Sequence, residues 1–411
     1  MTTVFGRASA AAFAALLLAA TPQAAMAQKE QKPPALKLSK PVQSLAAQAQ
    51  KAQGAGDWAG AVELLKQADA IPNKNADDLY IVNMLTLNSA INLKDNALIE
   101  KSLEGAVASG KLPAEDVVKF RRNLGALALQ RGDYGKAQAE FEQVLALNPS
   151  DAGLLVEIAE LQQRQKLPQK SIATLQQAIA TQEKTSKADE TWYRRALAIA
   201  YDSKLPAEIV STSEALVKAY PSPTNWRDVL IIYRESAKLD DQGNLDVMRL
   251  IRANNALTGE RDYAEFAETA TTRGLPGEAK SVLDEGIAKG ALKSTTPFVK
   301  ELSAVVTPKA AADKAQLNQL EKEARAAANG RSAMGTADAN LGFGNWAKAA
   351  ELYKLALEKG GIDADTANLR LAFTLGNAGD KAGAEAALAK VSGAPRNQLA
   401  RYYAAWLATK S

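Results

Sequence analysis

A short turn signature recurs along almost the whole chain, and its spacing is the feature that most constrains the fold. The middle residues of successive copies lie 38, 38, 34, 38, 70, 70 and 35 positions apart. A period near 35 predicts stacked helical hairpins, with one disguised copy inside each interval of 70. The eight copies are Gly56-Asp57-Trp58, Lys94-Asp95-Asn96, Gly132-Asp133-Tyr134, Lys166-Leu167-Pro168, Lys204-Leu205-Pro206, Gly274-Leu275-Pro276, Gly344-Asn345-Trp346 and Gly379-Asp380-Lys381.

The copy from Val118 to Asp151 has the most regular spacing. Gly125 is followed by Ala137 after twelve residues, by Phe141 after four more and by Pro149 after another eight. Two helices of a hairpin approach to about 8–10 Å, so the residues at their contact points must be small. We therefore expect Gly125 and Ala137 to form the contact, Phe141 to fill the space one turn further on, and Pro149 to end the second helix.

This spacing resembles the tetratricopeptide repeat, a helix–turn–helix unit of 34 residues. The tryptophan and tyrosine of the family's first helix are not matched, because Arg121 and Ala128 stand there. The resemblance implies an all-α fold, a right-handed α-solenoid of about eight to ten tetratricopeptide-like hairpins. It also implies a concave groove, lined by the first helix of each hairpin, in which ligands are bound.

The N-terminus has the pattern of a secretory signal peptide over residues 1–27. Arg7 is its only charge, Ala8–Ala20 is an apolar core, and Ala25-Met26-Ala27 supplies small residues for cleavage before Gln28. The apolar run is shorter than the roughly 20 residues that span a bilayer, which argues against a membrane anchor. We therefore predict a periplasmic or secreted protein, cleaved near Ala27.

The rest of the chain divides by composition and repeat spacing. Thr307-Pro308 is the weaker of the two disguised turns, so its surroundings are either a degenerate repeat or a helical spacer. The segment Arg396–Lys410 is predicted to be a capping helix, because a solenoid needs a final helix to cover its exposed end. The predicted segments are a flexible leader at 28–41, an N-terminal solenoid at 42–292, the degenerate repeat or spacer at 293–330, and C-terminal repeats with the cap at 331–411.

Composition excludes several kinds of chemistry. The chain has no cysteine and no histidine, so thiolate metal sites, disulfides, cysteine nucleophiles and the commonest general base are missing. The absence of cysteine also rules out a lipidated N-terminal cysteine. Fifty Lys and Arg against 46 Asp and Glu give a net charge of only +4, without the concentrated basic face that nucleic acids need. We expect no cofactor, no metal, no nucleic-acid partner, no integral membrane segment and no lipid anchor.

The repeat alignment indicates which side chains face the concave groove. Arg122, Arg194 and Arg227 fall at the same repeat position, so they are predicted to form a row along it. Such a row favours the carboxylates of an extended peptide or an acidic glycan. The alternative is that each arginine pairs with a neighbouring acid such as Glu157 or Asp228. The candidate groove residues are Asn88, Asn92, Lys119, Arg122, Arg194, Tyr201, Arg227 and Arg234.

Three functions remain after these observations. The leading one is a non-catalytic protein–protein interaction scaffold of the bacterial cell envelope, which binds a partner protein or peptide in the groove. The alternatives are a glycan-cleaving enzyme built on helical repeats, which needs a buried acid with a raised pKa, and a glycan-binding protein. A glycan-binding protein needs aromatic side chains exposed in the groove, where only Tyr201 and Tyr233 qualify. The sequence leaves the partner, the process and the oligomeric state open.

Overall fold

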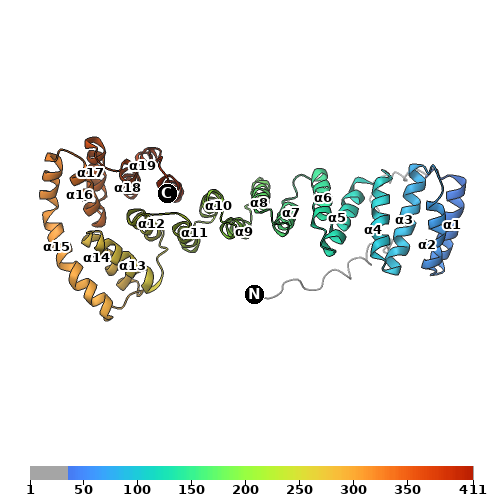
Figure 1. Cartoon of the computed structure of the whole chain (residues 1–411), viewed down its shortest axis with the longest axis horizontal. Coiled ribbons are helices and arrows are strands. Elements are labelled where there is room, and N and C mark those ends of the chain that lie inside the picture. The colour runs from blue at the N-terminus through green and yellow to red at the C-terminus, as the bar shows by residue number, and fades with distance from the viewer. Residues whose placement is uncertain (1–35, 411) are drawn as a thin grey trace, which may run out of the picture. The chain divides into compact units, whose positions relative to one another are not determined.

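The computed structural model describes residues 36–410, in which all regular structure is helical (Figure 1). The predicted signal peptide and residues 28–35 of the leader lie outside the described residues. The chain divides into two compact units, at Pro113 and Ala114. The first unit contains α1 (Lys40–Gly54), α2 (Trp58–Asp69), α3 (Ala76–Leu93) and α4 (Asn96–Ala108).

The second unit carries the other sixteen of the twenty described helices, which pack consecutively as expected for a tetratricopeptide-like solenoid. Apart from α15 and α20, the helices form antiparallel pairs. They are α5 (Ala114–Gln130), α6 (Tyr134–Leu147), α7 (Ala152–Arg164), α8 (Pro168–Gln182), α9 (Glu190–Asp202), α10 (Pro206–Ala219), α11 (Pro223–Ser236), α12 (Asp241–Ala253), α13 (Gly259–Thr272), α14 (Pro276–Ala288), α15 (Pro297–Ala326), α16 (Arg331–Gly342), α17 (Trp346–Lys359), α18 (Ala364–Asn377), α19 (Lys381–Leu388) and α20 (Arg396–Thr409).

The eight predicted turns connect the two helices of every pair except α11–α12. The first residue of every one of the eight copies has a positive φ, between 54° for Lys204 and 87° for Gly379. Where Asp133 follows, its side chain accepts a hydrogen bond from the backbone N–H of Lys136 and caps the next helix. Where Leu-Pro follows, as at Pro168, proline is the first helical residue and its missing N–H leaves no bond unmade. Two local chemistries therefore produce the same turn.

Small residues four positions after the turn centres lie where the helices touch. Gly125 faces Phe141 so closely that a Cβ on Gly125 would lie 2.3 Å from Cε1 of the ring. Eight positions after the turn centres stand large residues such as Phe141, with Ser213 as the exception. Ser213 adjoins Tyr402 of α20. The small residues, all with no exposed surface, are Ala61, Ala137, Ser171, Ala279, Ala349 and Ala384.

Of the two alternatives left open for 293–330, the turn at Thr307-Pro308 is absent and the segment is helical instead. A single helix of 30 residues, α15, runs through Pro308 without a break. Proline inside a helix leaves the carbonyl four residues earlier without its donor. Here that carbonyl belongs to Ala304, which is exposed, so water can satisfy it. The helix packs against α14 on one side and α16 on the other, and so links two sets of hairpins.

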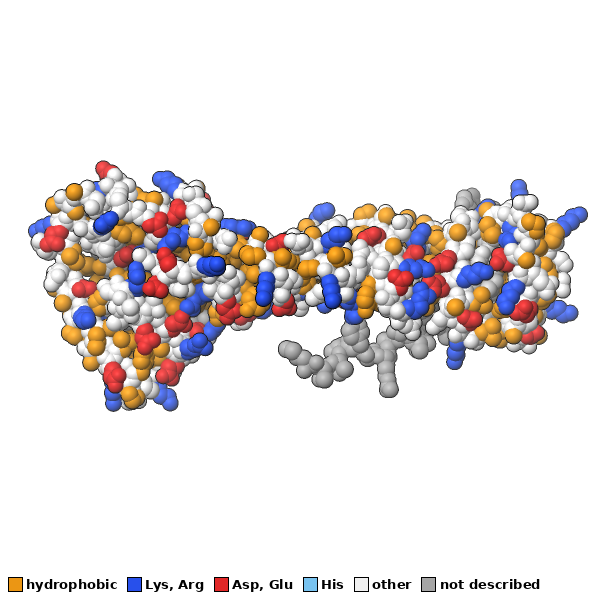
Figure 2. Space-filling view, in the orientation of Figure 1, with side chains coloured by type: hydrophobic (Ala, Val, Ile, Leu, Met, Phe, Trp, Pro, Cys, Tyr) orange, Lys and Arg blue, Asp and Glu red, His pale blue; other side chains and the backbone are white. Residues whose placement is uncertain are grey.

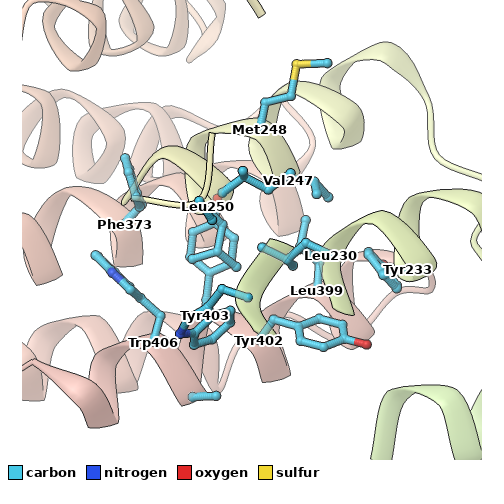
Figure 3. Packing of buried hydrophobic residues seen from close by; sticks show 14 of the residues in the cluster. Leu230, Tyr233, Val247, Met248, Leu250, Phe373, Leu399, Tyr402, Tyr403 and Trp406 are labelled. Carbon is cyan, nitrogen blue, oxygen red and sulfur yellow. The ribbon is translucent and has the colours of Figure 1, made fainter. Parts of the chain in front are cut away.

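The C-terminal helix α20 covers the last hairpin, as predicted for a cap, but it also packs against α10 and α12. Figure 3 shows Tyr402, Tyr403 and Trp406 of α20 among buried side chains of α11, α12 and α18. The Tyr403 hydroxyl donates to the main-chain oxygen of Asp246 at 2.7 Å, and Tyr233 donates to that of Pro395 at 2.7 Å. The chain from α10 to α20 therefore closes on itself instead of ending as an open stack.

A buried ion network lies at the centre of this closure. Asp246 of α12 accepts from Arg249 at 2.8 Å and from Arg370 of α18 at 2.9 Å. Arg249 binds both carboxylate oxygens of Glu278 in α14, and Arg370 binds both oxygens of Asp338 in α16. Both arginines are at most 3% exposed. Four helices are thus joined by charge-assisted bonds among side chains that are buried, apart from the partly exposed Asp338.

Gly125→Ala is expected to destabilise the α5–α6 pair, because the added methyl group must displace the Phe141 ring. Overpacking of this kind costs about 1–3 kcal/mol, measured as a lower melting temperature by circular dichroism. Gly135→Ala is the matched control, since its Cβ would meet only Asp133 Oδ1 at 3.8 Å. An equal effect of the two substitutions would contradict the close contact.

Arg370→Met is expected to lower the free energy of unfolding by about 3–5 kcal/mol, because Asp338 loses the arginine that binds it and the buried Asp246 keeps only Arg249. The comparison is Arg325→Met, which removes an arginine that pairs with Glu321 and is 46% exposed. That change should cost less than about 1 kcal/mol in urea denaturation. If the two variants unfold at the same urea concentration, the network does not hold the closed unit together.

Candidate functional site

The arginines predicted to form a row, Arg122, Arg194 and Arg227, are each paired with an acid later in the chain, and their role in partner binding stays a prediction. These arginines lie on α5, α9 and α11, each the first helix of its hairpin. The acids are supplied by the hairpin that follows. Pairing with a neighbouring acid is therefore what the structure shows for these side chains. The pairs are Arg122 Nη2 with Asp151 Oδ2 at 2.5 Å, Arg194 Nη1 with Asp228 Oδ2 at 3.1 Å, and Arg227 Nη2 with Asp262 Oδ1 at 2.9 Å.

The pairing has electrostatic consequences that stay local. Arg194 also donates from Nε to Glu190 at 2.8 Å, and this hydrogen bond, with a second from Asn225, holds the pKa of Glu190 below its usual value. The Tyr201 hydroxyl donates to Glu235 at 2.7 Å, which raises the pKa of Tyr201. These side chains therefore bind one another, and the contacts tie each repeat to the next.

Of the other candidates, two lie on α3 and one lies on α5, three residues before Arg122. Asn88 and Asn92 are in α3 of the first unit, where the Asn92 amide donates to the main-chain oxygen of Asn88 at 2.9 Å. Lys119 is exposed on α5 and pairs with Asp116 at 3.0 Å. Their role in partner binding stays a prediction. On the face drawn in Figure 2, Lys and Arg side chains alternate with Asp and Glu, without a basic patch.

Arg227 and Arg234 are brought together in a cleft of about 350 Å³ between α11 and α13, here called the α11–α13 cleft. Its floor is apolar and includes Met248 and Ile251 of α12, while its rim is charged. Met side chains adapt to different occupants because they are unbranched and flexible. The lining residues are Arg227, Ile231, Arg234, Glu235, Asn244, Met248, Ile251, Leu257, Arg261, Asp262 and Glu265.

Arg261 is one of the lining residues that were not predicted from the repeat alignment. It lies 34 positions after Arg227 and so continues the same row. Within residues 36–410 it makes no ion pair, although it is exposed at the cleft. The reason is that Thr295 and Thr296 stand one repeat later, where the other row members find their acids. The repeat spacing is a signal that could have identified it.

The structure gives little support to a glycan-cleaving enzyme or to a glycan-binding protein. Tyr233 is 1% exposed, so it packs in the core and is no platform for a sugar. Burial raises the pKa of Glu157, but 53% of its side chain is exposed and it does not line the α11–α13 cleft. Among the described residues, no acidic cluster is arranged to hold a metal ion. Within residues 36–410, no helix has both the length and the apolar character to cross a membrane.

Residues 128–189, which cover α6 to α8 and the end of α5, match the family model described as Tetratricopeptide repeat. The family predicted from the spacing around Val118–Asp151 is therefore supported for this segment. Members of such families are generally non-catalytic scaffolds that bind proteins or peptides. No curated protein matches the sequence.

Several solved structures are similar to the chain at low identity. A Naa15/Naa10 complex bound to HypK-THB is 15% identical, covers 86% of this chain and 64% of its own, and has a TM-score of 0.32. A tetratricopeptide repeat protein from Parabacteroides merdae is 14% identical, with coverage of 63% and 99% and a TM-score of 0.27. The C-terminal part of a repeat protein from Cytophaga hutchinsonii is 13% identical, with coverage of 79% and 98% and a TM-score of 0.26. These likenesses carry no argument about a partner.

The pair between Arg194 and Asp228 is expected to contribute modestly to stability, because the Arg194 side chain is 40% exposed. A double-mutant cycle of Arg194→Ala and Asp228→Ala should give a coupling of about 0.2–1 kcal/mol at low salt. The coupling should shrink as sodium chloride screens it. A coupling that is absent at low salt would show that the row does not link neighbouring repeats.

Proposed function

We propose that the chain is a non-catalytic protein–protein interaction scaffold of the bacterial cell envelope, which binds a segment of its partner in the α11–α13 cleft. The observation that supports this proposal is the unpaired Arg261 at the rim of a cleft with an apolar floor. The other arginines of the row are satisfied by acids of the chain itself. Arg261 can therefore receive a carboxylate from a partner without breaking an existing pair.

The floor of the cleft supports the same role. Met248 is 3% exposed and Ile251 is 4% exposed, so both are held in place by the packing of α12. Apolar side chains at the base and charges around the edge are the usual arrangement of a protein interface, in which a buried anchor provides affinity and the rim provides orientation. The expected ligand segment carries an apolar side chain next to an acidic one.

The envelope location is part of the proposal and rests on the sequence of residues 1–27. Their charge, apolar core and small residues have the order of a secretory signal. Fractionation of the source cells should place the chain in the periplasm or medium, and N-terminal sequencing should begin at Gln28. Recovery of the uncleaved chain in the cytoplasm would overturn this part of the proposal and leave the cleft unaffected.

Arg261→Glu is expected to weaken partner capture at least tenfold, because it replaces the attraction for a carboxylate by repulsion. Capture is measured by chemical crosslinking in cells, followed by purification of the full chain and mass spectrometry of what is bound. Arg273→Glu is the matched control, since it makes the same charge change at the end of the same helix but outside the cleft.

Both variants should keep the wild-type circular dichroism spectrum, because each side chain is exposed. The proposal predicts that one defined partner is lost with Arg261→Glu and kept with Arg273→Glu. Equal capture by wild type and Arg261→Glu would exclude the α11–α13 cleft as the binding site.

A further inference from the structure

A second cleft, of about 340 Å³, opens inside the closed part of the second unit and is separate from the α11–α13 cleft. One wall is aromatic and consists of Phe343, Trp346 and Phe373, from α17, α18 and the turn before α17. A polar wall includes Arg252 of α12, Glu285 of α14 and Lys289 directly after α14. We call it the α14–α17 cleft.

The aromatic wall is fixed by close packing at one end. A Cβ on Gly277, near the start of α14, would lie 2.5 Å from Cζ of Phe343, so this ring rests directly on the α14 backbone. Trp346 contacts Phe373 edge to face, with ring centroids 6.0 Å apart. Trp346 and Phe343 remain only half-buried. The two rings therefore present a rigid apolar surface that the protein itself does not cover completely.

The polar wall is fixed by ion pairs that leave donors free. Glu285 accepts from Arg252 Nε at 2.6 Å and from Lys289 Nζ at 2.9 Å, and Arg252 Nη2 donates to Ser281 at 2.8 Å. The Nη1 group of Arg252 makes no hydrogen bond within residues 36–410, and an ammonium group has three donors, of which Lys289 uses one on Glu285. Two cations face one carboxylate, so this wall has one positive charge in excess.

We propose that the α14–α17 cleft binds a small organic acid that carries one ring and one carboxylate. The ring would lie against Trp346 and Phe343, where aromatic faces favour offset or edge contacts. The carboxylate would accept from the free donors of Arg252 and Lys289 and balance the excess charge. The volume fits, since a cavity of about 150 Å³ holds benzene and this cleft is roughly twice that size.

The test uses three probes that separate the two features. Benzoate has the ring and the charge, benzamide has the ring alone, and acetate has the charge alone. The full chain is labelled with 5-fluorotryptophan, and the signal of Trp346 is assigned with Trp346→Phe. Benzoate is expected to shift this ¹⁹F signal saturably, and benzamide and acetate should bind at least about tenfold more weakly, because a charge-assisted bond and ring contact are each lost.

Lys289→Gln and Lys280→Gln form the matched pair of variants. Both lysines lie on or directly after α14 and pair with an acid four residues away, but only Lys289 lines the cleft. Lys289→Gln should weaken benzoate binding about tenfold, and Lys280→Gln should leave it unchanged. The proposal is overturned if benzoate leaves the Trp346 signal unmoved at millimolar concentration, if benzamide binds as well as benzoate, or if both variants behave alike.

Discussion

The carboxylate of Asp246 is the interaction on which the closed half of this molecule depends. It lies in the middle of α12, has no exposed surface, and accepts from Arg249 of the same helix and from Arg370, which is 124 residues away in the sequence. A buried carboxylate is costly unless it is paired and hydrogen-bonded. Arg249 of α12 itself supplies one partner, and Arg370 supplies the second when α18 packs against α12, which links closure to charge compensation.

Other residues that bind the two arginines also restrict how these helices pack. Glu278 and Asp338 each receive a two-fold contact from an arginine, so the guanidinium planes are held in one orientation. Tyr353 donates to Asp338 at 2.5 Å, and burial beside this carboxylate raises the pKa of the Tyr353 hydroxyl so that it keeps its proton. An apolar core alone would allow α12 to rotate or slide. The directional bonds select one register among α12, α14, α16 and α18.

Features encoded by neighbouring residues were predictable from the sequence, and features that depend on distant contacts were not. The turn at Gly132 is determined by three consecutive residues, and the contact of Gly125 with Phe141 lies within one hairpin. The packing of α20 against α10 joins Arg401 to Glu214, 187 residues earlier, and no periodic pattern reports such a contact. Pro308 does not begin a helix, because water can satisfy the exposed carbonyl that a proline inside a helix leaves without its donor.

In the candidate site, too, positions along a helix were predictable from the sequence and contacts between distant residues were not. The repeat frame predicted Arg227 and Arg234 at groove-facing positions of one helix, and both line the α11–α13 cleft, but it could not show that Arg227 would pair with Asp262. In a regular solenoid each repeat can satisfy the side chains of the repeat before it, because the same acid recurs one period later. That regularity ends at α15, which replaces a hairpin with one long helix and supplies no acid to Arg261. Beyond this helix the chain turns back and packs α20 against α12. Arg261 thus remains unpaired because the repeat is interrupted, and a binding surface is expected where a repeating chain stops pairing its own charges.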